Sequence, residues 1–84
     1  MKLWLISQTE NDDYDTYSDA VVVAETETEA THMHPSQRFP KVWPEWNTEY
    51  SSDWASHPDK VTAKLIGEAA EGVTGVVCAS FHAG

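Results

Sequence analysis

Positively charged residues are scarce in this sequence. It contains 5 Lys and Arg against 14 Asp and Glu, a formal net charge of -9 on 84 residues. Between Leu3 and Gln37 there are eight carboxylates and no Lys or Arg. Nucleic-acid binding depends on Lys and Arg that neutralise phosphates, so the composition argues against direct nucleic-acid binding. It fits a basic partner better, including a protein surface that normally holds nucleic acid.

Cysteine and long hydrophobic runs are also nearly absent. Cys78 is the single cysteine, so no internal disulfide is expected, and a lone thiol fits a reducing cytoplasm. Because it lies in the apolar run Val76–Ala79, we expect it to be a small core residue. The apolar run Leu3–Ile6 is too short for a signal-peptide core or a membrane span. The sequence therefore predicts a cytoplasmic protein.

The remaining composition is that of a folded chain. Hydrophobic residues make up 40% and aromatic residues 11%, which is unlike a disordered acidic chain. We predict one small acidic domain over residues 1–84, since this length leaves no room for a second core.

Local patterns predict the order of the elements. Lys2–Gln8 has large apolar groups on both faces of a strand, and Ala20–Ala24 is a β-branched run typical of a strand covered on both sides. The residues between them, Asn11–Asp19, favour a turn. Val61–Ile66 and Val76–Phe81 are expected to form two further strands.

A short helix is expected after the second strand. Thr26-Glu27-Thr28-Glu29 is a capping box, and Pro35 limits how far the helix extends. The segment 35–58 is predicted to be a Trp-rich loop that folds over Trp4 and Ile6. The fold class is therefore α+β: a four-stranded, mainly antiparallel sheet in the order β-β-α-β-β, with one short helix on a face.

No catalytic or metal-binding motif stands out. The spacing of Asp13 and Asp15, at alternate positions, resembles that of a calcium loop. However, Ser18 and Ala24 occupy the positions where an EF-hand needs Gly and Glu. The spacing of His32 and His34, with His57 or Asp59 as a third ligand, leaves a metal-dependent site as a minor alternative. We predict a protein that is not an enzyme, with no cofactor and no metal.

Two regions are candidates for partner binding. The acidic turn is either a solvated, repelling loop or a binding surface; its tyrosines favour binding, because Tyr is enriched at interfaces. The Trp residues of the loop are either buried over the sheet or exposed as contact anchors. The predicted partner-binding residues are Asp12, Asp13, Tyr14, Asp15, Tyr17, Asp19, Glu25, Glu27, Glu29, Trp46 and Trp54.

Three stretches carry a resemblance: the opening 1–8, the middle 14–30 and the end 75–84. Together they look like small uncharacterised reading frames of phages and prophages. The resemblance implies a context of acidic accessory proteins, among which inhibitors of bacterial defence complexes, such as anti-CRISPR proteins, are similar in size and charge. It transfers no binding residue, because the matching positions are those that make the fold.

The sequence thus predicts a phage-type accessory protein. It would bind a basic surface of a host or defence protein complex and block access of nucleic acid, either by mimicking the charge of nucleic acid or by plain steric blocking. The alternative is a self-associating structural module with no inhibitory role, in which Trp4 and Ile6 pair with another copy in a homodimer. No membrane partner is expected.

Overall fold

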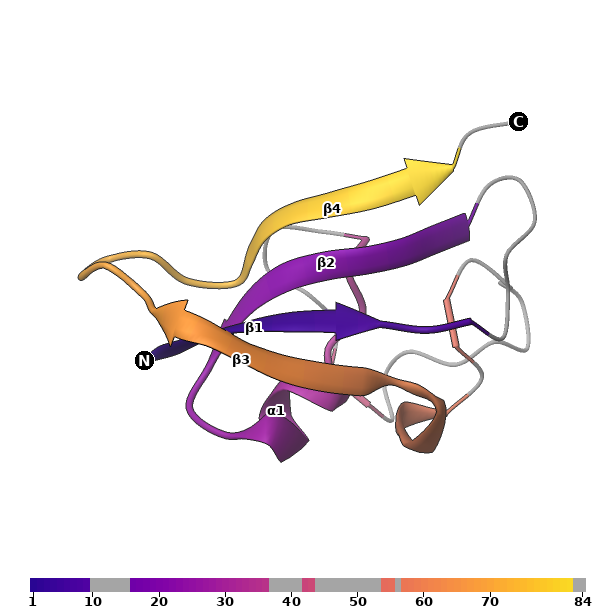
Figure 1. Cartoon of the computed structure of the whole chain (residues 1–84), viewed down its shortest axis with the longest axis horizontal. Coiled ribbons are helices and arrows are strands. Elements are labelled where there is room, and N and C mark those ends of the chain that lie inside the picture. Colours follow the sequence, from indigo (N-terminus) through magenta and orange to yellow (C-terminus); the bar gives the residue numbers. More distant parts are fainter. Residues whose placement is uncertain (10–15, 37–41, 44–53, 56, 83–84) are drawn as a thin grey trace.

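The chain folds into one antiparallel sheet with a short helix against it, as predicted (Figure 1). This computed structural model describes residues 1–9, 16–36, 42–43, 54–55 and 57–82, with only the backbone of residues 81 and 82. The strands lie in the order β3-β1-β2-β4, and each pairs antiparallel with its neighbour. The elements are β1 Lys2–Ser7, β2 Thr16–Ala24, α1 Glu27–Thr31, the 3-10 helix η1 Pro58–Lys60, β3 Thr62–Glu68 and β4 Val76–His82.

The hairpin of β1 and β2 forms the middle of the sheet. The pairing of Leu5 with Val21 and of Ile6 with Ala20 sets the register of the two strands. This register puts the even-numbered side chains of both strands on one face and the odd-numbered side chains on the other, because successive side chains alternate across a strand. The strands β3 and β4 are then added outside the hairpin, one at each edge.

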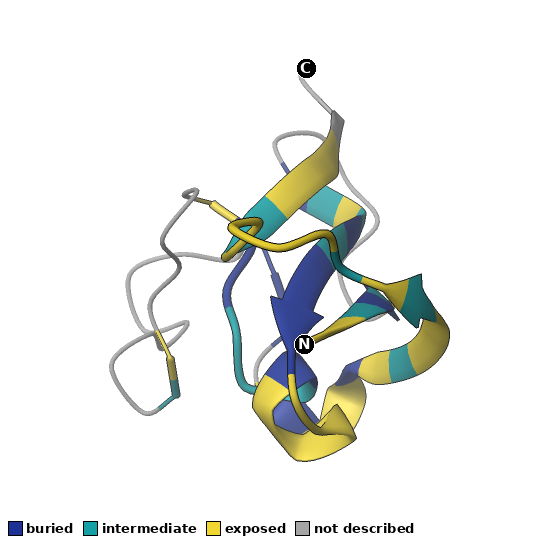
Figure 2. Cartoon of the chain, turned by 90° about the vertical axis from the view of Figure 1, so that its left-hand side faces the viewer, coloured by how far each residue is buried: buried dark blue, intermediate teal, exposed yellow. Residues whose placement is uncertain are grey.

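The even-numbered face, here called the covered face, carries the hydrophobic core. Trp4 and Ile6 are 8% and 0% exposed, and the indole Nε1 of Trp4 donates to the carbonyl of Ala24 at 3.0 Å. Trp54 is fully buried in the same cluster, so this residue of the Trp-rich segment does fold over Trp4 and Ile6 as predicted. The buried cluster consists of Trp4, Ile6, Ala20, Val22, Ala24, Ala30, Trp54, Ala55 and Val61 (Figure 2).

The helix α1 is short and depends on its cap. The hydroxyl of Thr26 accepts from the amide of Glu29 at 3.2 Å, which is the first half of the predicted capping box. The carboxylate of Glu29 accepts from the amide of Glu25, whereas in a capping box it would accept from the amide of Thr26. Ala30 anchors the helix in the core at 0% exposure, so a single small side chain lets the helix approach the sheet closely.

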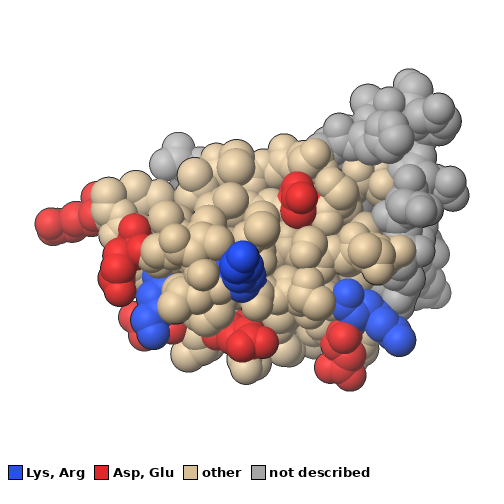
Figure 3. All heavy atoms as spheres, viewed as in Figure 1, with Lys and Arg blue, Asp and Glu red and all other residues tan. Residues whose placement is uncertain are grey.

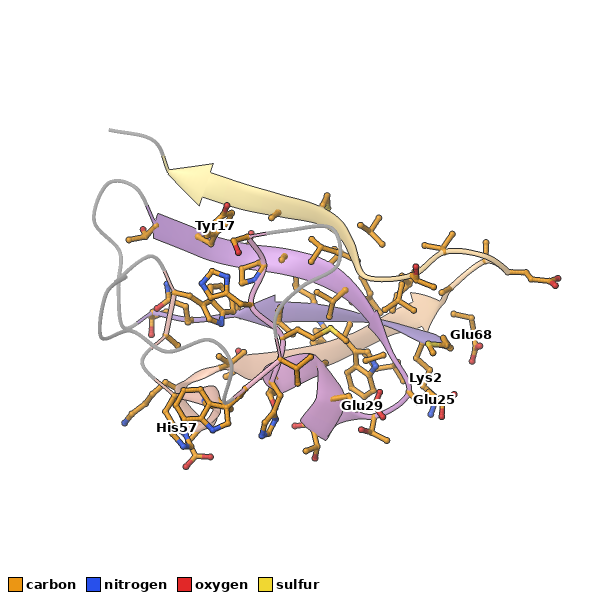
Figure 4. The ribbon with its side chains drawn as sticks, turned by 180° about the vertical axis from the view of Figure 1, so that it is seen from behind. Lys2, Tyr17, Glu25, Glu29, His57 and Glu68 are labelled. Carbon is orange, nitrogen blue, oxygen red and sulfur yellow. The ribbon has the colours of Figure 1, made fainter. Side chains whose placement is uncertain are left out.

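The odd-numbered face, here called the open face, is apolar but less enclosed. Leu3, Leu5 and Val21 on it are half-buried, and no described helix lies over them; Figure 1 looks onto this face and Figure 4 onto the covered one. Val23 is the exception at 3% exposed, and its amide donates to the carbonyl of Gly75 in the connection between β3 and β4. Large apolar groups on both faces of β1 were expected from the sequence.

Two expectations about buried residues are wrong. Cys78 is exposed, because β4 is an edge strand that pairs only with β2 among the described elements. Trp4 and Ile6 lie under α1 and Trp54 in the core, so they cannot pair with another copy. Self-association through these two side chains is therefore excluded.

Candidate partner-binding surface

Exposed carboxylates gather at the end of the sheet where β1 begins and β2 ends. Glu25 follows β2, and Glu27 and Glu29 form the first turn of α1, a position where the helix dipole favours negative charge. From the other half of the chain, Glu68 ends β3 opposite Lys2. Figure 4 shows Glu25, Glu29 and Glu68 at this one end, with Lys2 among them. We call this group the acidic end: Glu25, Glu27, Glu29, Glu68 and Glu71.

The connection from β3 to β4 completes this end. The amide of Ala69 donates to the carbonyl of Met1 at 3.0 Å, which holds the beginning of the connection against the start of β1. Glu71 is exposed on this connection two residues later. Of the three Lys and Arg in the described ranges, Lys2 is the one at this end, so negative charge dominates here.

The predicted acidic surface is therefore divided. Asp19 pairs with Ser7 near the far end of β2, whereas Ala24, next to Glu25, pairs with Lys2. At about 3.3 Å per residue, Asp19 and Ala24 lie roughly 16 Å apart along the strand. Asp19 is half-buried on the open face, so it does not belong to the same surface as the glutamates of α1.

Tyr17 is partly occupied with the core. Its ring meets that of His34 edge-on, with centroids 6.1 Å apart, and its carbonyl accepts from the side chain of Gln8 at 2.8 Å. A bulge in β2 between Tyr17 and Asp19 turns Tyr17 toward the covered face. Part of its surface is therefore held by the core rather than offered to a partner.

Trp54 does not supply an exposed contact. Its side chain is 0% exposed and stands edge-on to the ring of His34, with centroids 6.4 Å apart. The prediction that Trp54 anchors a partner is wrong for this structure, because a core residue cannot leave without opening the core. Trp43, in contrast, is half-buried, and the centroid of its ring lies 4.8 Å from that of His57.

The histidines do not converge on one point. His34 is buried, and its Nδ1 accepts from the amide of Ser36, while Nδ1 of His57 accepts from the amide of Asp59. Nδ1 of His32 lies 2.6 Å from the carbonyl oxygen of Thr28. Within the described residues no group of three or more His, Cys, Asp and Glu is placed to hold a metal ion. The rings of His34 and His57 thus each stabilise a local turn by accepting a backbone hydrogen bond at Nδ1.

Several predicted contacts lie outside the described residues: Asp12, Asp13, Tyr14, Asp15 and Trp46. The structure adds two residues that sequence reasoning missed, Glu68 and Glu71. They are about 40 residues from the glutamates of α1 in sequence, and only the pairing of β3 with β1 brings them to the same end. Their only signal was a change from apolar residues to Glu at the end of a predicted strand.

In the part of the chain that the structure describes, no helix has the length and apolar character needed to cross a membrane. Comparison with protein families, with curated proteins and with solved structures found no match to this chain.

Proposed function

We propose that this chain is a non-catalytic binding protein whose acidic end engages a basic surface of a nucleic-acid-binding protein complex. The proposal takes up the phage context that the sequence suggests: an accessory protein that keeps nucleic acid from a host or defence complex of the CRISPR type. The observation that carries it is the gathering of five exposed carboxylates from two distant parts of the chain, with Lys2 alone beside them among the described residues.

The arrangement favours an electrostatic contact over a catalytic one. The carboxylates of the acidic end are exposed, and exposed carboxylates have no desolvated environment in which to act as acids or bases. Exposed charges of one sign act instead on a charged partner, by raising the association rate and by selecting a partner of opposite charge. A surface that normally binds phosphates carries the Lys and Arg that such an acidic end would meet.

Its mechanism would be occupation of the basic surface. The chain and the nucleic acid would compete for the same Lys and Arg side chains, so binding of one would release the other. Because the glutamates are exposed, screening should weaken the complex strongly as salt is raised, with a Debye length of about 8 Å at physiological ionic strength.

Single charge reversals test this function. The immobilised chain is used to capture proteins from bacterial lysate that contains a CRISPR-type defence complex, with washes at low and then high salt. The captured complex is then purified, and its affinity is measured for the chain and for nucleic acid. We expect the chain to displace nucleic acid, and Glu27→Lys and Glu68→Lys each to weaken binding by roughly 3- to 10-fold and to flatten its salt dependence.

Asp59→Lys is the matched control, because it changes the net charge equally at an exposed position of η1, away from the acidic end. If Asp59→Lys weakens binding as much as Glu68→Lys does, net charge alone accounts for the attraction and the acidic end has no special role. If no nucleic-acid-binding complex is retained at low salt, the proposed function is wrong.

A further inference from the structure

We infer that the open face of the sheet is a self-complementary surface on which a second copy of this chain docks. The surface is distinct from the acidic end, so this inference does not depend on the proposed function. It also differs from the self-association expected from the sequence, which used the opposite, covered face.

The middle of the open face is apolar. Leu5 pairs with Val21, which in turn pairs with Cys78 on β4, so three apolar side chains lie in a row across three strands. The next row contains Leu3 and Val23. Leu3, Leu5 and Val21 remain half-buried without a described element above them. Figure 3 shows a largely uncharged surface on this side, with a basic and an acidic group standing within it and the other charged groups toward its margins.

Two charges of opposite sign flank this apolar middle. Lys64 on β3 pairs with Leu5, which puts it on the open face, where it is exposed. Asp19 on β2 pairs with Ser7 and shares that face. The strand β1 lies between them, and these two described residues form no ion pair with each other within one chain.

A second copy of the chain allows both charged groups to pair. A two-fold axis parallel to the sheet, midway between the two charged residues, brings Lys64 of each copy to Asp19 of the other. Since β1 is the strand midway between β3 and β2, this axis passes over β1 and brings the Leu5 side chains of the two copies close together. A two-fold interface requires such self-complementarity, in which each contact occurs twice. The open face is also close to neutral in a protein of charge -9, so it is the surface where two copies repel each other least.

Association through the sheet edges fits the structure less well. Both edge strands are interrupted by a bulge: Ile66 on β3 has no partner between Leu65 and Gly67, and Val77 on β4 has none between Val76 and Cys78. Bulges at an edge disturb the hydrogen-bonding row that a further strand would need. The face offers a continuous surface, whereas the edges do not.

The contact is small, so the dimer should be weak. Three strand spacings and six residues of pairing give a patch about 15 Å by 20 Å, which falls short of the roughly 800 Å² per partner of a standard interface. We expect a dissociation constant on the order of 100 μM, with a monomer at low micromolar concentration.

Charge exchange between Lys64 and Asp19 tests the inference. Sedimentation equilibrium of the full chain at 0.15 M salt is measured from about 10 μM to 1 mM. The average mass is expected to rise from one chain toward two. Lys64→Asp and Asp19→Lys should each weaken dimerisation at least about 5-fold, because each places like charges together. The double variant, K64D with D19K, restores the opposite-sign pair and should restore the dimer.

Lys60→Asp serves as the control, since it makes the same charge change at an exposed lysine of η1 and should leave dimerisation close to that of the unaltered chain. A monomer throughout the concentration range overturns the inference. So does a dimer that the single reversals leave intact, or one that the double variant fails to restore, because the copies would then meet through another surface. Circular dichroism of each variant confirms that a loss of dimer is not a loss of fold.

Discussion

At the scale of single residues, burial decides what each aromatic or polar group can do. Four Trp residues in an acidic chain predicted both a core and a contact surface, and the sequence does not separate the two roles. The structure assigns Trp54 and Trp4 to the core, where their large apolar surfaces support a small domain. The spacing of aromatic residues along a loop carries no information about which of them reach the sheet, since that depends on long-range packing.

Two glycines make a matched pair for measuring the cost of backbone conformation. Gly72 has a φ of 86°, and Gly67 has no positive φ; a Cβ added at either position would meet no atom within 4 Å. Gly72→Ala should therefore lower the free energy of unfolding by about 1–2 kcal/mol through backbone strain alone. Gly67→Ala should be close to neutral, or slightly stabilising through the unfolded state. Urea denaturation of the two variants measures the difference, and equal effects would contradict this account.

At the scale of elements, strand positions could be predicted because each strand is a run of β-branched or large apolar residues between turn residues. The pairing of Leu5 with Val21 follows from the hairpin, a local contact. What could not be predicted is the side of the hairpin on which β3 and β4 lie. That order depends on packing between segments that are far apart in the sequence, and it decides that Cys78 stands at an edge, exposed.

The helix α1 depends on local contacts whose contribution to stability can be measured. Its single turn is held by the Thr26 hydroxyl and by one buried residue, Ala30. Thr26→Ala removes the acceptor for the amide of Glu29 and should cost about 1 kcal/mol of stability. Thr28→Ala, two residues later at an exposed helical position, should change stability by no more than about 0.5 kcal/mol. If both variants melt alike, the cap does not hold the helix.

At the scale of the whole molecule, charge is distributed unevenly. The acidic end concentrates negative charge, the open face is nearly neutral, and the core lies between the sheet and α1 (Figures 2 and 3). The sequence predicted the acidic character and the glutamates of α1. It could not predict that Asp19 would be separated from them, because that depends on the length and direction of β2.

The net charge predicts a salt response of the folded state. Self-repulsion is stronger in the compact chain than in the unfolded one, and added salt screens it. The free energy of unfolding should therefore rise as sodium chloride is increased from about 0.01 to 0.5 M. The measurement is urea denaturation at low micromolar concentration, which keeps the chain monomeric. If the free energy of unfolding is constant or falls over this range, repulsion between the carboxylates does not destabilise the folded state.

The strand order has a consequence for the sequence of events during synthesis. The central hairpin of β1 and β2 is synthesised before β3 and β4, so β2 keeps an open edge until β4 has been translated some 50 residues later. Through that interval the valines of β2 present an unpaired edge to any other nascent chain. The last strand therefore protects the edge of β2. A chain that stops before Val76 would leave this edge unpaired and prone to aggregate.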